Sequence, residues 1–337
     1  MKNLKATYMG LELKNPIIAG SSNLSFDIDS LKGLEDAGAS AIVFKSLFEE
    51  QILLEKAILE DDLDEYAERH AEMTSLFPKL EHAGAKEYLL KLEKARKVVS
   101  VPLFASLNAI FKETWVEYAR QIEQTGVDGI ELNFFAIPKD ADITGSDIEK
   151  QQLAIVHEIK KNINIPISVK LSPFYSNTLN FIKSLDKEGV DGLVLFNRFY
   201  NPDIDIENMK FDSLHHLSHN DESKLPLRYA GLLYSNIAAS ICCNSGIHQG
   251  TDVIKMLLAG ADCVQVVSTL YRNKLTHIKT MLHDIELWMD FQNIKSLEEI
   301  RGKLSRKNLH DPFVYQRAQY IDLLIKSDEL MNKYTLR

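Results

Sequence analysis

Apolar runs and amphipathic stretches follow one another along the chain in a regular order. Four segments share one pattern, in which a helical stretch ends at a glycine, a short turn carries Ser or Asp, and an apolar run follows. They are residues 34–45, 122–133, 185–197 and 257–268. Each glycine stands where a helix end favours a left-handed residue, and the Ser or Asp two positions later suits a turn. The pattern predicts four helix–turn–strand units.

Four more apolar runs complete the set. Three of them begin at Asn-Pro, Val-Pro or Ile-Pro (15–16, 101–102 and 165–166), and the fourth covers 238–243. Proline is tolerated at the first residue of a strand. Strands that alternate with helices pair in parallel, and eight such units over about 250 residues match a (β/α)8 TIM barrel. We therefore expect an α/β fold of this type.

A doubly wound open sheet is the alternative, but it predicts a Gly-x-Gly-x-x-Gly turn that residues 19–23 (Ala-Gly-Ser-Ser-Asn) lack. Acidic and apolar residues alternate over 49–92, which predicts an insert after strand 2. The polar stretch 201–228 predicts a second insert after strand 6. A helical tail is expected after residue 291, with one last amphipathic helix over 315–330. We expect a barrel domain over 1–305 and a helical C-terminal extension over 306–337 that packs on it.

Composition narrows the function classes. A formal net charge of −9 argues against nucleic-acid binding, which needs clustered Lys and Arg. No apolar run approaches the roughly 20 residues of a membrane span, and no signal peptide is expected at the N-terminus. Cys242, Cys243 and Cys263 lie in apolar runs, which predicts reduced, buried thiols in a cytoplasmic protein. No metal site is predicted, although His215, His216 and His219 cluster.

Polar side chains stand where the predicted strands end, and function lies at that end of such barrels. They include Ser21, Lys45, Ser106, Asn133, Lys170, Asn197, Ser245 and Ser268. Lys45 and Lys170 could pair with acids of the insert, but two lysines on apolar strands favour an anionic or electron-rich ligand. Residues 244–247 and 267–270 suit phosphate binding through backbone N–H groups, while Thr269 could also simply cap a helix. The combination indicates an elongated cofactor such as FMN.

Several motifs in this order resemble the dihydroorotate dehydrogenase family, nearest its soluble class 1 enzymes. They are 15–22 (Asn-Pro-Ile-Ile-Ala-Gly-Ser-Ser), 44–46, 129–133 (Gly-Ile-Glu-Leu-Asn), 167–174, 244–250, 259–261, 265–269 and 300–304. The resemblance implies an FMN-dependent oxidoreductase of CH–CH bonds in pyrimidine biosynthesis, forming a cytoplasmic homodimer. It implies FMN contacts from Gly20, Ser21, Lys45, Asn133, Lys170, Ser245, Gly246, Ser268 and Thr269. Asn133, Asn197 and Arg198 would lie on the substrate side.

The chain departs from this family at the positions of the catalytic base and of the substrate-binding residues. The family motif after strand 4 reads Asn-Leu-Ser-Cys-Pro-Asn, whereas this chain has Asn-Phe-Phe-Ala-Ile-Pro over 133–138. Ala136 therefore stands at the position of the family's base, and Pro138 replaces a substrate-binding Asn. Arg198 replaces a Ser or Thr, and Ser245 and Ser268 replace phosphate-binding glycines. Residues 73–79 keep only a trace of the family's substrate loop.

Three functions remain open from the residues alone. The leading one is an FMN-binding oxidoreductase with an altered, small anionic substrate and little dihydroorotate activity, because alanine cannot accept a proton. The second is a non-catalytic flavin-binding protein with a sensing or partner role. The third is a flavin-free lyase that uses Lys45 or Lys170 as a Schiff-base amine.

Overall fold

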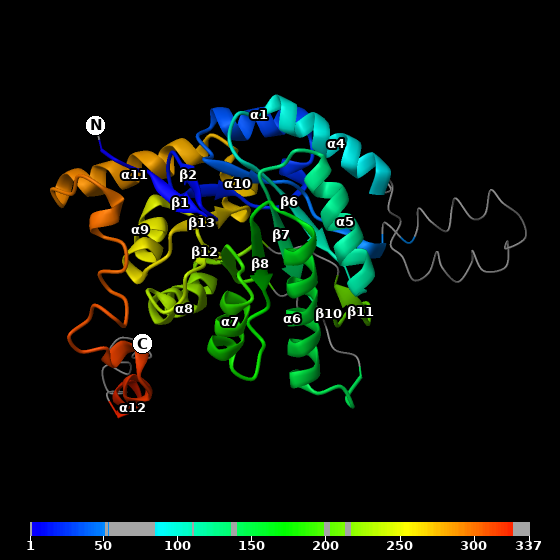
Figure 1. Cartoon of the computed structure of the whole chain (residues 1–337). Helices are drawn as coiled ribbons and strands as arrows, with labels where there is room; N and C mark the ends of the chain where they lie inside the picture. The colour runs from blue at the N-terminus through cyan, green and yellow to red at the C-terminus, as the bar shows by residue number, and fades with distance from the viewer. Residues whose placement is uncertain are drawn as a thin grey trace, which may run out of the picture.

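Eight parallel strands in the described part of the chain close into a barrel (Figure 1). The computed structural model describes residues 2–50, 53, 85–109, 111–135, 140–198, 203–212 and 217–325. The barrel strands are β3 (Ile17–Ala19), β4 (Ala41–Val43), β6 (Leu103–Asn108), β7 (Gly129–Phe134), β8 (Ile167–Leu171), β9 (Gly192–Leu195), β12 (Ser240–Asn244) and β13 (Cys263–Val266). Each pairs in parallel with its neighbours, and β13 pairs with β3, so the TIM-barrel prediction is confirmed.

Helices surround the barrel and cover the outward faces of its strands (Figure 1). They are α1 (Ile28–Asp36), α4 (Ala85–Val98), α5 (Lys112–Gln124), α6 (Gly145–Asn162), α7 (Thr178–Lys187), α8 (Lys224–Leu233), α9 (Gly250–Ala259), α10 (Ser268–Asn273) and α11 (His277–Phe291). The main core lies between strands and helices, for example where Phe134 packs edge-on against Trp115. A hairpin of β1 (Ala6–Tyr8) and β2 (Leu11–Leu13) closes the end of the barrel at which the strands begin. Its Tyr8 and Leu13 pack inside with Phe104.

The Ser or Asp of each sequence repeat does more than form a turn. Its side chain binds the backbone of the first or second residue of the preceding barrel strand. Asp128 accepts a hydrogen bond from Leu103, Asp191 from Ile167 and Asp262 from Ile241, at 2.7–2.8 Å between nitrogen and oxygen. Ser40 instead donates to the carbonyl of Ile17. The repeat therefore fixes neighbouring strands at the N-terminal end of the barrel.

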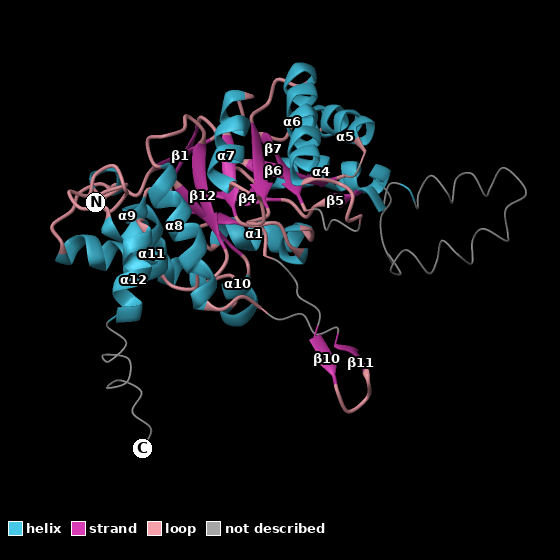
Figure 2. Cartoon of the chain, turned by 90° about the horizontal axis from the view of Figure 1, so that it is seen from below, coloured by secondary structure: helices cyan, strands magenta, loops and turns pink. Residues whose placement is uncertain are grey.

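The predicted inserts differ in outcome. β5 (Leu47–Phe48) comes just before the first insert, and most of 49–92 lies outside the described residues until α4 begins at Ala85. The insert after strand 6 contains a hairpin, β10 (Asp203–Asp205) and β11 (Lys210–Asp212), which extends away from the barrel (Figure 2). The 3-10 helix η2 (Asn220–Ser223) then leads directly into α8. No helix in the described ranges combines the length and apolar character that crossing a membrane requires.

The C-terminal part is less helical than predicted. In the tail after residue 291, where helix was expected, the 3-10 helix η3 (Leu297–Glu299) forms instead, and turns follow it. The last helix is α12 (Arg317–Ile325), preceded by the 3-10 helix η4 (Phe313–Tyr315), so within the described range it begins two residues later than expected. Arg228 of α8 donates hydrogen bonds to the carbonyls of Val314 and Tyr315, which ties this segment to the barrel. The boundary at residue 305 stays a prediction.

Candidate functional site

The inward-facing side chains of β7, β8 and β13 follow the two-residue alternation of a strand. On β7, Leu132 packs in the outer core, while Glu131 and Asn133 face the barrel interior and its mouth. Lys170 of β8 lies opposite Asn133 in the strand register. Gln265 of β13 reaches the same space from across the barrel. Alternation thus brings polar groups from distant strands together.

A cavity of about 270 Å³ opens at the C-terminal ends of the strands. Of the residues predicted for the site, nine line it: Ser21, Lys45, Asn133, Lys170, Asn197, Arg198, Ser245, Gly246 and Ser268. Gly20 does not line it, and its N–H donates to the carbonyl of Val266. Thr269 is fully buried, and its hydroxyl donates to the carbonyl of His248 at 3.0 Å. The structure therefore brings most, but not all, of the predicted residues to one cavity.

Lys170 has a buried partner. Its ammonium lies 3.6 Å from a carboxylate oxygen of Glu131, and the two residues are 8% and 1% exposed. The other Glu131 oxygen accepts a hydrogen bond from the side-chain amide of Gln265. The acid that pairs with Lys170 therefore belongs to the barrel, while most acids of the insert lie outside the described residues.

Lys45 is held differently. Its ammonium lies 5.1 Å from the centre of the Phe26 ring, and that of Lys91 lies 4.3 Å from the same centre. Burial, and then the charge of Lys91, lower the pKa of Lys45. Lys45 forms no ion pair with any carboxylate that the structure describes. Among the described residues, its charge therefore has no carboxylate to offset it.

Hydroxyl and amide groups connect the wall of the cavity. Ser46 lies 3.3 Å from the hydroxyl of Ser21 and 2.6 Å from that of Ser106. The Asn197 side chain donates to the Asn133 side-chain oxygen at 2.6 Å. These bonds fix the orientation of the amides that face the cavity.

The two turns predicted to hold phosphate lie next to each other. Ser245 and Gly246 have φ values of 75° and 70°, so a serine adopts the left-handed region that favours glycine. Within the described ranges, the backbone N–H groups of Gly246 and Ser268 have no hydrogen-bond acceptor. Such groups suit an anion. The Ser268 hydroxyl, however, already accepts a hydrogen bond from the N–H of Ser218.

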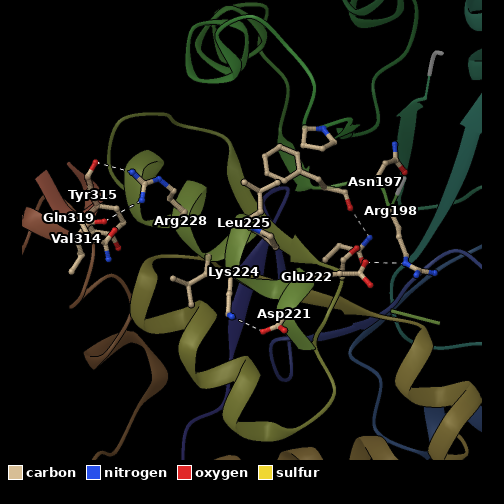
Figure 3. A pocket seen from close by; sticks show the side chains of 16 residues that line it. Asn197, Arg198, Asp221, Glu222, Lys224, Leu225, Arg228, Val314, Tyr315 and Gln319 are labelled. Atoms are coloured by element: carbon tan, nitrogen blue, oxygen red, sulfur yellow. Dashed lines mark hydrogen bonds and ion pairs between the residues drawn. The ribbon is translucent and has the colours of Figure 1, made fainter. Parts of the chain in front are cut away.

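A second cavity, of about 870 Å³, adjoins the first through Asn197, Arg198 and Ser245 (Figure 3). Its charged side chains are engaged with one another or with the backbone. Arg198 pairs with Glu222 at 3.0 Å, and Lys224 pairs with Asp221 at 2.6 Å. The positive charge expected from Arg198 is therefore partly offset by Glu222.

Sequence reasoning missed Glu131, Gln265 and Ser46. Glu131 could have been found, because it stands two residues before Asn133 and must share its face of the strand. Gln265 stands two residues after Cys263 on β13, but its contact with Glu131 depends on closure of the barrel. Ser46 carries no local signal.

Three hydroxyl groups near the mouth by sequence position, those of Ser106, Ser172 and Tyr175, are the remaining candidates for a base. Ser106 is fully buried beside Ser46, and Tyr175 donates to Gln152 at 2.8 Å. Burial raises the pKa of Tyr175, which keeps its phenol neutral. Neither is placed to take a proton from a substrate, and nothing in the geometry distinguishes Ser172.

Several predicted positions lie outside the described residues: 73–79, Ala136, Pro138, His215 and His216. Within the described ranges, no three His, Cys, Asp or Glu side chains converge to hold a metal ion. Cys242, Cys243 and Cys263 are buried and free, as expected of reduced thiols.

Comparison with known proteins agrees with the barrel fold. The family model described as dihydroorotate dehydrogenase matches residues 78–289, more than half of the chain. "Dihydroorotate dehydrogenase B (NAD(+)), catalytic subunit" of Thermoplasma volcanium is 28% identical over 315 residues, covering 90% of this chain and 98% of the relative. The protein of the same name from Methanocaldococcus jannaschii is 27% identical, covering 89% and 97%. "Dihydroorotate dehydrogenase A (fumarate)" of Lactobacillus delbrueckii is 25% identical, covering 90% and 99%. The chain belongs to the dihydroorotate dehydrogenase family.

Proposed function

We propose that this chain is an FMN-binding oxidoreductase whose substrate differs from dihydroorotate. The observation that carries the proposal is the convergence of Lys45, Asn133, Lys170 and Asn197 on one cavity at the barrel mouth. A buried lysine and a half-buried lysine beside paired amides suit an electron-rich ring with polar edges. Without a ligand, no carboxylate in the described ranges would offset the charge of Lys45.

The residues present fit FMN. The side-chain oxygen of Gln265 is buried without a partner at the cavity wall and can accept a ring N–H. The open backbone N–H groups of Gly246 and Ser268 can hold a phosphate, with Ser245 in the same turn. Ser21, Lys45, Asn133 and Lys170 would hold the ring, while Gly20 and Thr269 would shape the backbone around it. When bound, FMN supplies the ability to accept a hydride.

The substrate side has lost the features that dihydroorotate would need. Alanine at 136 cannot accept a proton, and a missing general base costs about 100- to 10,000-fold in rate. Asn133 and Asn197 remain to bind a substrate through their amides, and Arg198, whose charge Glu222 partly offsets, lies beside them. A small anionic substrate other than dihydroorotate suits this set.

Visible spectroscopy tests the cofactor directly. The purified chain should show flavin absorbance, or take up FMN on titration with quenching of flavin fluorescence. A colourless protein that takes up no FMN would refute the proposal.

Turnover tests the substrate. The FMN-loaded protein should oxidise dihydroorotate at no more than a trace rate with NAD⁺, fumarate or a dye as acceptor. NAD⁺ and fumarate are chosen because the names of the relatives carry them. Rapid, saturable oxidation of dihydroorotate would show that the substrate is unchanged.

The second candidate is a non-catalytic flavin-binding protein with a sensing or partner role. The apolar Phe-Phe-Ala-Ile-Pro run at 134–138 favours it, since none of its side chains can transfer a proton. It predicts bound FMN that a panel of small anionic CH–CH substrates does not reduce. Steady turnover with any of them and an acceptor would exclude it.

We also propose that the chain forms a homodimer in the cytoplasm. The β10–β11 hairpin exposes Ile204, Ile206, Met209 and Phe211, each more than half exposed, and an isolated hairpin is marginally stable in water. A partner copy would cover these side chains. Light scattering should give twice the monomer mass, and a monomer at micromolar concentration would contradict the proposal.

A further inference from the structure

A buried carboxylate lies directly beneath the cavity. Glu131 is 1% exposed, and it does not line the cavity itself, whereas its partners Lys170 and Gln265 do. The three side chains come from β7, β8 and β13, so the contact between Glu131 and Gln265 crosses the barrel interior. Below them, the buried Tyr8 and Leu13 of the β1–β2 hairpin close the interior. Water therefore screens this negative charge poorly.

The charge that Lys170 presents to a ligand depends on this neighbour. One Glu131 oxygen lies 3.6 Å from the Lys170 ammonium and has no hydrogen-bond partner, while the other is held by Gln265. The charges of Glu131 and Lys170 largely cancel for any group that lies farther away. Their attraction also fixes the position of the Lys170 ammonium. A lysine alone at this place would favour additional negative charge on a ring above it much more strongly.

We propose that Glu131 is a positioning residue that orients Lys170 and offsets its charge, so that the Glu131–Lys170 pair sets the relative affinity of the site for reduced and oxidised flavin. The inference rests on the proposed FMN site and adds to it a residue that touches no ligand. Two-electron reduction of FMN with uptake of one proton adds one negative charge to the ring. Glu131 opposes that charge, and Lys170 favours it.

Glu131→Gln removes the charge and keeps the shape. The new amide can still accept from the Gln265 nitrogen, and its own N–H₂ can donate to the Gln265 oxygen, which has no partner now. The variant is therefore expected to fold. Lys170→Met removes the opposite charge, and the double variant Glu131→Gln/Lys170→Met removes both.

The experiment measures the FMN dissociation constant in the oxidised state by titration, and the midpoint potential by dithionite reduction against a reference dye. Glu131→Gln should increase the preference for reduced over oxidised flavin about tenfold, which raises the two-electron potential by 29.6 mV. Lys170→Met should decrease that preference, and the double variant should return toward the wild-type value. Glu35→Gln, at a buried glutamate at the opposite end of the barrel, serves as the control and should not change the ratio.

The outcomes separate the two proposals. If the wild type binds FMN and Glu131→Gln leaves the potential unchanged, the charge-offset role is refuted while the FMN site stands. If both single variants merely weaken FMN binding in both redox states equally, Glu131 has only a structural role. If the wild type binds no FMN, the proposed function fails. Denaturant unfolding of the flavin-free variants then tests the pairing, because additive effects in the double variant would overturn it.

Discussion

On the β8 side of the cavity, the ammonium of Lys170 lies 3.6 Å from the Glu131 carboxylate, and Gln265 holds that carboxylate in turn. On the β4 side, Lys45 lies over the Phe26 ring with Lys91 nearby and has no carboxylate partner among the described residues. We call the first region, formed by Lys170, Glu131 and Gln265, the wall, and its opposite charges offset each other. We call the second region, formed by Lys45, Phe26 and Lys91, the rim, and no described carboxylate offsets the charge of Lys45. The wall therefore fixes its own side chains for a cofactor, whereas the rim presents an ammonium that no described carboxylate offsets.

The largest expected effect comes from the loop after β7. Ala136→Cys places a thiol at the position of the family's base, and it should raise dihydroorotate oxidation by the FMN-loaded protein about 100-fold. We choose the low end of the range for a general base because Pro138 and Arg198 still lack the family's substrate contacts. Initial rates with a dye acceptor measure the gain.

Ala141→Cys, which adds a thiol at an exposed position in the following loop, is the matched control. It should leave the rate unchanged. An Ala136→Cys protein that binds FMN and stays as inactive as its parent would show that the missing base is not what limits the reaction.

The wall should be far more sensitive than the rim in stability. Lys170→Met leaves Glu131 buried without its cation, and breaking a buried pair in this way costs about 3–5 kcal/mol. Urea denaturation of the flavin-free protein measures the loss. An unfolding free energy within about 0.5 kcal/mol of the wild type would show that the pair contributes nothing, since that is the usual range for a surface substitution.

Much of this arrangement could be predicted from the sequence, because it is local. The helix–Gly–turn–strand repeat marks in the sequence where a helix ends and the next strand begins. Asn133 and Lys170 could be placed at strand ends because each stands at the end of an apolar run. The partners of these residues could not all be predicted. Glu131 meets Gln265 only because the barrel closes, 134 residues apart in sequence, and Glu222 meets Arg198 only because an insert folds back. Contacts that depend on closure or on a long loop have no periodic signal.

At the rim, Lys45→Met should reduce ligand affinity rather than stability. It removes a partly buried cation that has no described carboxylate partner, so the unfolding free energy should change by less than about 1 kcal/mol. A charge-assisted hydrogen bond contributes about 1.5–3 kcal/mol, so FMN or an anionic substrate should bind about 10- to 100-fold more weakly. Fluorescence titration measures the affinity, and Lys307→Met, at an exposed lysine, is the control. A destabilisation as large as that of Lys170→Met would remove the distinction between wall and rim.

The smallest effect is a pH dependence that should come from the rim alone. Burial and Lys91 lower the pKa of Lys45, so this side chain loses its charge at a lower pH in the folded chain than in the unfolded chain. Between the two pKa values the unfolded chain binds more protons, so the contribution of Lys45 to folding stability rises with pH in that window. Affinity for an anion falls in the same window, because the ammonium that attracts it is lost. FMN titrations at increasing alkaline pH should therefore show a decline in wild-type affinity that is weaker in Lys45→Met. A decline of equal size in both proteins would assign it to another group and leave Lys45 without a role in anion binding.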